Sequence, residues 1–157
     1  MSTDDPTTTS DRPKDPGDGA LADAIAAEHA TIYGYGFVSA HITPDLNELV
    51  SDSFSEHRGR REAAIAMMSA HGQTPPIAAV GYQLPIPVNN YRDAATLAVR
   101  MESDTAVAWR AVIEQATDGP ERELGVKALR ECAVRAARWR LVIEAWPLTV
   151  PFPGSNT

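Results

Sequence analysis

The stretches ALADAIAAEHATIYGY (residues 20–35) and LAVRMESDTAVAWRAVI (residues 97–113) decide how this chain folds. In both, apolar residues recur every three or four positions, the period of an α-helix with one buried face. Glu28 and Glu102 fall in the middle of these apolar faces. A buried carboxylate is costly unless it is paired, protonated or bound to a metal ion. The partners of these two glutamates therefore limit what the protein can do.

Composition excludes several classes of function. The chain has 157 residues, 43% of them hydrophobic, which suits one soluble domain. A net charge of -7 and a pI near 5.0 argue against a nucleic-acid partner. No apolar run approaches the roughly 20 residues that span a bilayer, and the N-terminus lacks the apolar core of a signal peptide. A single cysteine, Cys132, excludes an intramolecular disulfide and favours a cytoplasmic protein.

The remaining sequence predicts four long helices joined by two short turns and one long connection. Thr43-Pro44 ends the first helix and caps the second, and residues 118–120 (Asp-Gly-Pro) form the other short turn. Residues 73–90 contain four prolines and cannot form a regular helix. The expected helices run from about Asp18 to Ile42, from Pro44 to Ala70, from Asn90 to Thr117 and from Pro120 to Pro147.

These lengths and connections predict an all-α, ferritin-like four-helix bundle with a long crossover between helices 2 and 3. Residues 18–147 form the bundle. Residues 1–17 contain no large apolar side chain beyond the initial methionine, so we expect a disordered acidic and proline-rich tail. Residues 148–157 form an extended C-terminal tail.

Five ionisable residues are expected to meet in the bundle. Counting residues from each turn places Glu28 level with His57, and Glu102 level with Arg135. Arg61 belongs to a basic run at residues 58–61 that is flanked by acids, and it is the member expected to face inward. The expected polar network or ligand pocket is therefore Glu28, His57, Arg61, Glu102 and Arg135.

The charges of these residues favour a site without metal. A ferritin-like di-metal site needs a Glu from each of two helices and Glu-x-x-His from each of the other two. Helices 2 and 4 lack Glu-x-x-His here, and Arg61 and Arg135 stand at comparable places. Two glutamates and two arginines sum to zero charge without an ion. The alternatives are iron or manganese held by Glu28, His57 and Glu102, or a small anionic ligand held by the two arginines.

Four stretches carry a resemblance to a known family. They are AEHATIYGYGFVSAH (27–41), SEHRGRREAAIAMM (55–68), YRDAATLAVRMESDTAVAWR (91–110) and RWRLVIEAWPLTVPFPG (138–154). The chain resembles an uncharacterised ferritin-like family of high-GC bacteria, known only as a domain of unknown function. The resemblance implies a ferritin-like bundle with Glu28 and Glu102 at the positions of the lone glutamates of helices 1 and 3. It implies no established activity.

The sequence therefore favours a binding or assembly module without a metal over an enzyme, with no catalytic residue assigned. A metal-dependent oxidase is the alternative. Tyr33 and Phe37 project about 100° from the core face of helix 1 and predict an exposed patch that could form a homodimer. Alternatively, the C-terminal tail, with Val150 and Phe152, could cover that patch.

Overall fold

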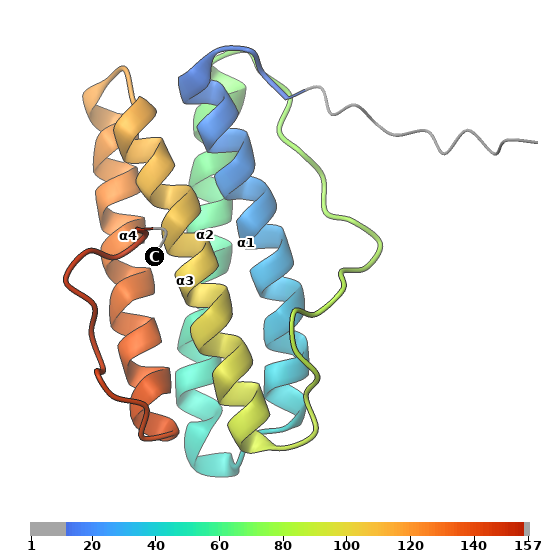
Figure 1. Ribbon diagram of the computed structural model, residues 1–157. Helices are drawn as coiled ribbons and strands as arrows, with labels where there is room; N and C mark the ends of the chain where they lie inside the picture. The colour runs from blue at the N-terminus through green and yellow to red at the C-terminus, as the bar shows by residue number, and fades with distance from the viewer. Residues whose placement is uncertain (1–11, 156–157) are drawn as a thin grey trace, which may run out of the picture.

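The computed structural model of this chain describes residues 12–155 and is all-helical over this range. Four long helices and one short 3₁₀ turn form a bundle (Figure 1). None of these helices is long and apolar enough to cross a membrane. The elements are α1 (Pro16–Ala40), η1 (Pro44–Leu46), α2 (Asn47–Ala70), α3 (Tyr91–Gln115) and α4 (Gly119–Val142).

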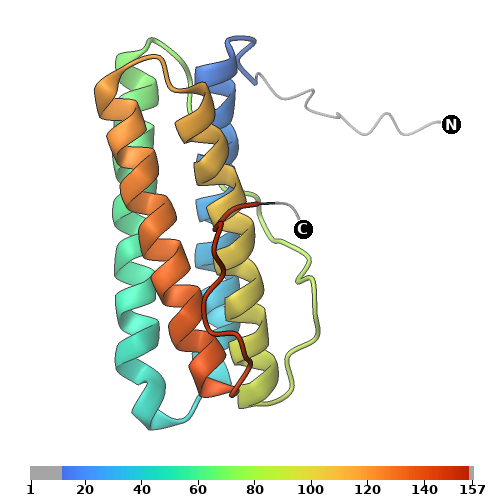
Figure 2. The same cartoon turned by 60° about the vertical axis from the view of Figure 1, so that its left-hand side comes forward.

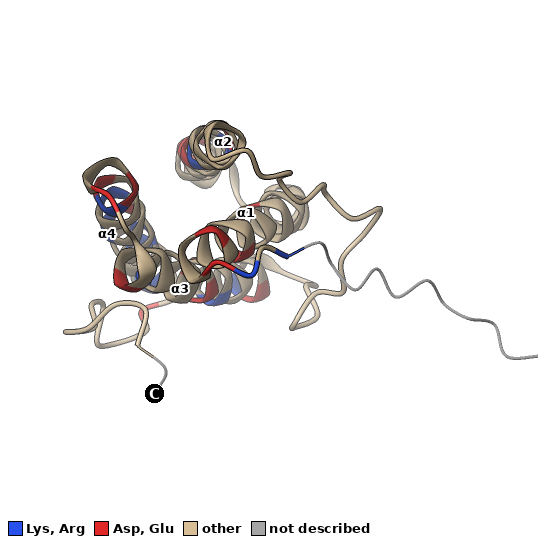
Figure 3. Cartoon of the chain, turned by 90° about the horizontal axis from the view of Figure 1, so that it is seen from above, with Lys and Arg blue, Asp and Glu red and all other residues tan. Residues whose placement is uncertain are grey.

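The long connection decides the topology. The segment between α2 and α3 travels the whole length of the bundle, so α3 starts at the same end as α2 and runs parallel to it (Figure 1). The short turns make α2 antiparallel to α1, and α4 antiparallel to α3. Seen from above, the helices stand at four corners in the order α1, α2, α4, α3 (Figure 3). This is the arrangement that the connection lengths predict.

The N-terminal boundary differs from the prediction. Helix α1 starts at Pro16 rather than near Asp18, and Asp15 is its N-cap, with a carboxylate that accepts from the Asp18 amide at 3.0 Å. Arg12 pairs with Asp23 at 2.9 Å, so this part of the predicted tail folds back on α1. A proline at the first helical position and an Asp before it start a helix regardless of the polar composition around them. Residues 1–11 lie outside the described range.

Two other helix ends were also misplaced. The Thr43 hydroxyl makes no capping hydrogen bond, and the chain passes through η1 before α2 begins at Asn47. Helix α4 stops at Val142 rather than at Pro147, because Glu144 adopts a left-handed φ of 54°. Asn90 and Asp118 cap α3 and α4 through their side chains.

The crossover and the C-terminal tail lie on different sides of the bundle (Figures 2 and 3). In the crossover, Tyr82 packs on Tyr33 with ring centroids 5.3 Å apart, which covers part of the aromatic patch predicted on helix 1. Phe37 stays 38% exposed. The tail runs along α3 and α4 instead, with Phe152 72% exposed, so the expectation that it covers the helix 1 patch was wrong.

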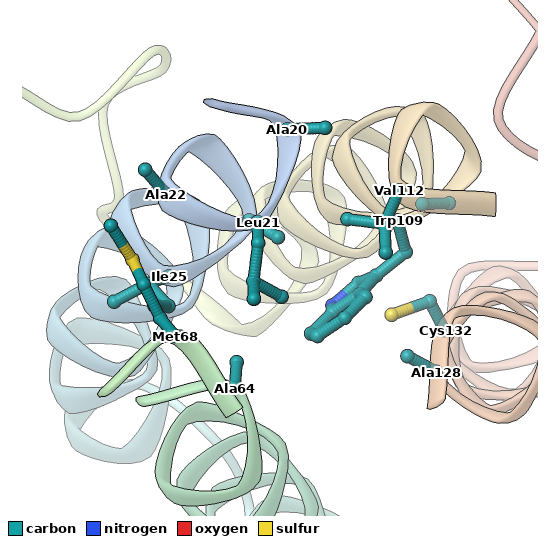
Figure 4. Close-up of a cluster of buried hydrophobic side chains, with 12 residues drawn as sticks. Ala20, Leu21, Ala22, Ile25, Ala64, Met68, Trp109, Val112, Ala128 and Cys132 are labelled. Atoms are coloured by element: carbon teal, nitrogen blue, oxygen red, sulfur yellow. The ribbon is translucent and has the colours of Figure 1, made fainter. Parts of the chain in front are cut away.

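The core consists of two apolar clusters separated by a polar layer. One cluster, drawn in Figure 4, surrounds Leu21, Trp109 and Cys132 near the α3–α4 turn. The other surrounds Val50 and Trp139 toward the opposite end. Every helix contributes to both clusters, and the polar side chains between them form the candidate site.

Candidate functional site

The polar layer consists of buried ionisable side chains from three helices: one from α1, two from α2 and one from α3. Glu28 on α1, His57 on α2 and Glu102 on α3 are fully buried, and Arg60 on α2 is 4% exposed. Residues this polar are almost never fully buried unless they are paired. Their contacts therefore account for the site.

Glu28 is the most heavily bonded of these groups. Its Oε1 accepts from Arg60 Nε at 3.0 Å and from the Trp109 indole at 2.7 Å. Its Oε2 lies 2.5 Å from His57 Nδ1. Burial raises the pKa of the Glu28 carboxyl, but the hydrogen bond and charge of His57, the charge of Arg60 and the Trp109 bond together bring the pKa below its ordinary value. Glu28 is thus a carboxylate.

Glu102 forms the other end of the chain of hydrogen bonds. Its Oε1 accepts from His57 Nε2 at 3.0 Å and from the Tyr35 hydroxyl at 2.6 Å. The Tyr35 hydroxyl in turn accepts from the Trp139 indole at 2.9 Å. Burial and the adjacent carboxylate raise the pKa of Tyr35 well above its ordinary value, so this phenol remains a donor. Glu102 Oε2 has no hydrogen-bond partner in the described residues.

His57 sits between the two carboxylates and is charged. Burial lowers the pKa of its imidazole, but the charges of Glu102 and Glu28 and their hydrogen bonds outweigh burial and raise the pKa to about 9. Both ring nitrogens then donate, one to each glutamate. Arg60 Nη2 lies only 2.9 Å from His57 Nδ1. When His57 is protonated, this contact brings two positively charged donors together. Glu28 is bonded to both residues, and its negative charge offsets their repulsion.

Arg60 also links the layer to α4. Its Nη1 donates to Glu131 at 2.9 Å and lies 3.8 Å from Glu56. Glu56 accepts from Arg135 Nη2, so carboxylates and guanidinium groups alternate along the seam between α2 and α4. Glu56, one of the acids that flank the basic run at residues 58–61, faces this seam. Arg135 is 5% exposed, and its Nε and Nη1 have no partner in the described residues.

The structure brings together some of the predicted residues and not others. Glu28, His57 and Glu102 are in direct contact. Arg135 is buried but bonds Glu56 rather than Glu102. The placement of Arg61 was wrong: it is part-exposed and pairs with its neighbour Glu62 at 2.7 Å.

Arg60 takes the place predicted for Arg61 for a physical reason. Positions three and four residues beyond His57 both suit a helical period, so apolar neighbours must decide between them. The buried face of α2 is Val50, Ser53, His57, Arg60, Ala64 and Met68. Three of these positions are polar, and a face drawn from apolar residues alone is therefore rotated toward Arg61.

Three hydrogen-bond donors of the site were not predicted. They are Tyr35, Trp109 and Trp139. Tyr35 lies seven residues after Glu28, and Trp109 seven after Glu102, two helical turns along the same face. An aromatic donor on the same face as a buried carboxylate is the signal that identifies Tyr35 and Trp109.

A metal ion does not fit this donor set. The alternative site of Glu28, His57 and Glu102 needs a free lone pair on His57, yet both ring nitrogens are committed to carboxylates. Arg60 adds a permanent positive charge that bonds directly to Glu28. Two carboxylates and two cations already sum to zero. Within residues 12–155, no three or more His, Cys, Asp or Glu side chains are arranged to hold a metal ion.

Cys132 lies against this layer from α4 and is fully buried. Burial and the Glu102 carboxylate raise the pKa of its thiol well above the ordinary value, and Arg60 offsets only part of this. The side chain is therefore a neutral thiol that packs in the apolar cluster, not a nucleophile.

Comparisons with known proteins identify relatives but no activity. A model of the domain of unknown function DUF4439 matches residues 20–157. A crystal structure of a conserved hypothetical protein from Mycobacterium tuberculosis is similar at 55% sequence identity and a TM-score of 0.81, covering 88% of this chain and 97% of that one. No curated protein matches the chain.

Substituting Arg60 and Arg61 separately distinguishes the two positions. Arg60→Met removes the cation that Glu28 and Glu131 share, and the free energy of unfolding should fall by roughly 3–5 kcal/mol. Arg61→Met removes only an exposed pair and should change it by about 0.5 kcal/mol or less. Urea unfolding followed by circular dichroism measures both. Equal losses in the two variants would show that Arg60 does not hold the core together.

The charge on His57 predicts a pH dependence of stability. A pKa raised from 6.5 to about 9 stabilises the folded state fully below pH 6.5, and this contribution is lost as pH rises through about 9. The loss amounts to about 3 kcal/mol. In His57→Gln most of the fall across this window should be absent, whereas His71→Gln should retain most of it, because solvent screens the smaller contribution of the raised pKa of His71 at its part-exposed pair with Asp18. Urea unfolding at a series of pH values tests this, and an unchanged fall in His57→Gln contradicts a charged His57.

Proposed function

This chain belongs to the DUF4439 family of domains of unknown function, and we propose that it is a ferritin-like bundle that acts as a binding module without a metal centre. The observation that carries this proposal is the bond from Arg60 Nε to Glu28 at 3.0 Å in the middle of the bundle. A guanidinium cannot be deprotonated, so it occupies the centre as a permanent charge.

The ferritin-like assignment is supported by topology and by two residues. Ferritin-like folds are four-helix bundles with one long crossover, and this chain places its long connection between α2 and α3. They also contribute a lone inward Glu from each of two helices, and Glu28 and Glu102 occupy such positions on α1 and α3.

The other two helices, α2 and α4, lack the residues that would complete a di-metal site. Where a di-metal protein has Glu-x-x-His on each, α2 has His57-x-x-Arg60 and α4 has Arg135. The positive charge that metal ions supply to the glutamates of a di-metal site is supplied here by His57 and Arg60. A metal-dependent oxidase would need a bundle centre in which His57 and Arg60 do not occupy the glutamates.

A small anionic ligand is the second candidate, and Arg135 is the residue that favours it. Two of its nitrogens are buried without a partner in the described residues, and such groups are costly to leave unpaired. The Glu56 carboxylate, bonded to the same guanidinium, opposes it. An anion would therefore have to bind at Nε and Nη1, the two nitrogens that Glu56 leaves unpaired.

Metal analysis tests the proposal directly. The intact chain, purified without chelators, should contain well under one equivalent of iron or manganese, and added Mn²⁺ should leave its Tm unchanged. The double variant H57E/R60H introduces the Glu-x-x-His spacing on α2 and removes Arg60, so it should gain Mn²⁺ affinity. Two equivalents of iron or manganese in the wild-type chain, with oxygen-dependent chemistry, would favour the oxidase. Phosphate bound at Arg135 would favour the anion-binding alternative.

We keep two further proposals, a cytoplasmic location and a homodimer. The first is supported by the lone cysteine. The second now depends on Phe37 and the adjacent Gly36, since a Cβ at Gly36 would meet no atom within 4 Å, whereas Gly34 packs tightly against Met101. Sedimentation velocity should then detect a dimer that Phe37→Asp dissociates without loss of helicity. A monomer at tens of micromolar would reject it.

A further inference from the structure

A deep groove lies on the side of the bundle away from α2. It is bounded by α3, α4 and the C-terminal tail, and its volume is about 1170 Å³. Figure 2 shows the tail passing over this side of the two helices. The groove is larger than most sites for drug-sized ligands, which are roughly 300–1,000 Å³.

The tail crosses the groove as a strap attached at two points. Near its start, Arg140 Nη1 donates to the Leu148 carbonyl at 3.1 Å. Near its end, Gly154 has a φ of 75° and sits so close to α3 that a Cβ there would lie 2.6 Å from the Ala106 carbonyl oxygen. Between these points, Val150 and Phe152 are 43% and 72% exposed. The strap therefore presents apolar side chains that the protein does not cover.

The groove beneath the strap is apolar and lined by small residues. Alanines of α4 leave room along its length, and larger aliphatic side chains close its sides. Representative lining residues are Val107, Leu129, Ala133, Ala137 and Leu141. The apolar part of this lining suits a hydrocarbon chain, and the polar lining residues include the arginines of the rim.

The rim of the groove is positively charged, in a protein whose net charge is -7. Arg130 and Arg138 line it and make no ion pair within residues 12–155. The other rim pair, Arg100 and Asp104, neutralise each other at 3.0 Å. Arg130 and Arg138 are eight residues apart on α4, about 12 Å along its axis. They are the cations free to bind an anionic group.

Glu102 sets the direction of a ligand. It lines the inner end of the groove, and its Oε2 is the buried acceptor without a partner. A second carboxylate or a phosphate placed there would face a buried negative charge. An anionic head group therefore belongs at the arginine rim, with the apolar part of the molecule pointing inward under the strap.

From these features we propose that the groove between α3, α4 and residues 148–154 binds a single-chain anionic amphiphile. The acyl chain lies along the alanines of α4, beneath the strap. A carboxylate or phosphate head group pairs with Arg130 or Arg138 at the rim. This site shares Glu102 with the bundle centre, but its apolar lining and its arginine rim lie outside the central network.

Calorimetric titration of the intact chain with dodecanoate, below its micelle concentration, tests the proposal. Dodecanoate should bind saturably at one site, whereas hexanoate, with a shorter chain, and dodecyltrimethylammonium, with the opposite charge, should bind at least tenfold more weakly. Dodecyl phosphate in a parallel titration distinguishes the two head groups. A carboxylate site prefers dodecanoate, and a phosphate site prefers dodecyl phosphate.

Substitutions test the arginine rim and the apolar groove one at a time. R130E/R138E changes only exposed side chains, so it should keep its helicity and bind dodecanoate at least tenfold more weakly. Ala133→Phe should block the groove and abolish binding. R58E, an exposed charge reversal on α2, is the matched control and should bind as wild type does. No saturable binding of either anion, equal binding of the cationic amphiphile, or unchanged affinity in R130E/R138E would overturn the proposal.

Discussion

Two carboxylates in the middle of a helical bundle must be neutralised, and the way this chain does so organises the rest of the molecule. Glu28 and Glu102 share His57, whose two ring nitrogens point in opposite directions and can serve one carboxylate each. Arg60 supplies the second positive charge. The hydrogen bonds extend from the Trp139 indole on α4 through Tyr35 to Glu102 on α3, so the neutralisation involves all four helices.

Such a network determines how the helices are positioned more than it raises the free energy of unfolding. Replacing a buried ion network with apolar residues is often neutral or stabilising, whereas removing one partner is costly. The two donors on α2, His57 and Arg60, bond to carboxylates of α1, α3 and α4. A shift of α2 by a single turn would therefore break several bonds at once. The layer separates two apolar clusters, and apolar contacts alone would allow the helices to slide along one another. We infer that it fixes the register of α1, α2 and α3.

The sequence predicted the helices and part of the site, because both follow from periodicity and distance along the chain. Glu28 and His57 were placed at one level by counting residues from a turn, and they are in contact. Periodicity alone could not choose Arg60 over Arg61, because the choice depends on Glu131 of α4 lying opposite. It also could not show that Asp15 caps α1 or where the C-terminal tail lies, since these depend on local hydrogen bonds and on contacts distant in sequence.

The distribution of arginine connects the bundle centre with its surface. Inside, Arg60 and Arg135 are buried and face carboxylates of α2 and α4, so their charges are used to hold these helices together. Outside, the exposed Arg130 and Arg138 of α4 line the apolar groove. Helix α4 thus carries one buried cation that is structural, Arg135, and two exposed cations that make no ion pair within residues 12–155. A ligand bound outside would touch the network only through Glu102, which is common to both the layer and the groove floor. Because Glu102 Oε1 is held by His57 and Tyr35 while Oε2 has no partner in the described residues, a buried carboxylate oxygen is left at the inner end of the groove, where it disfavours a second anion.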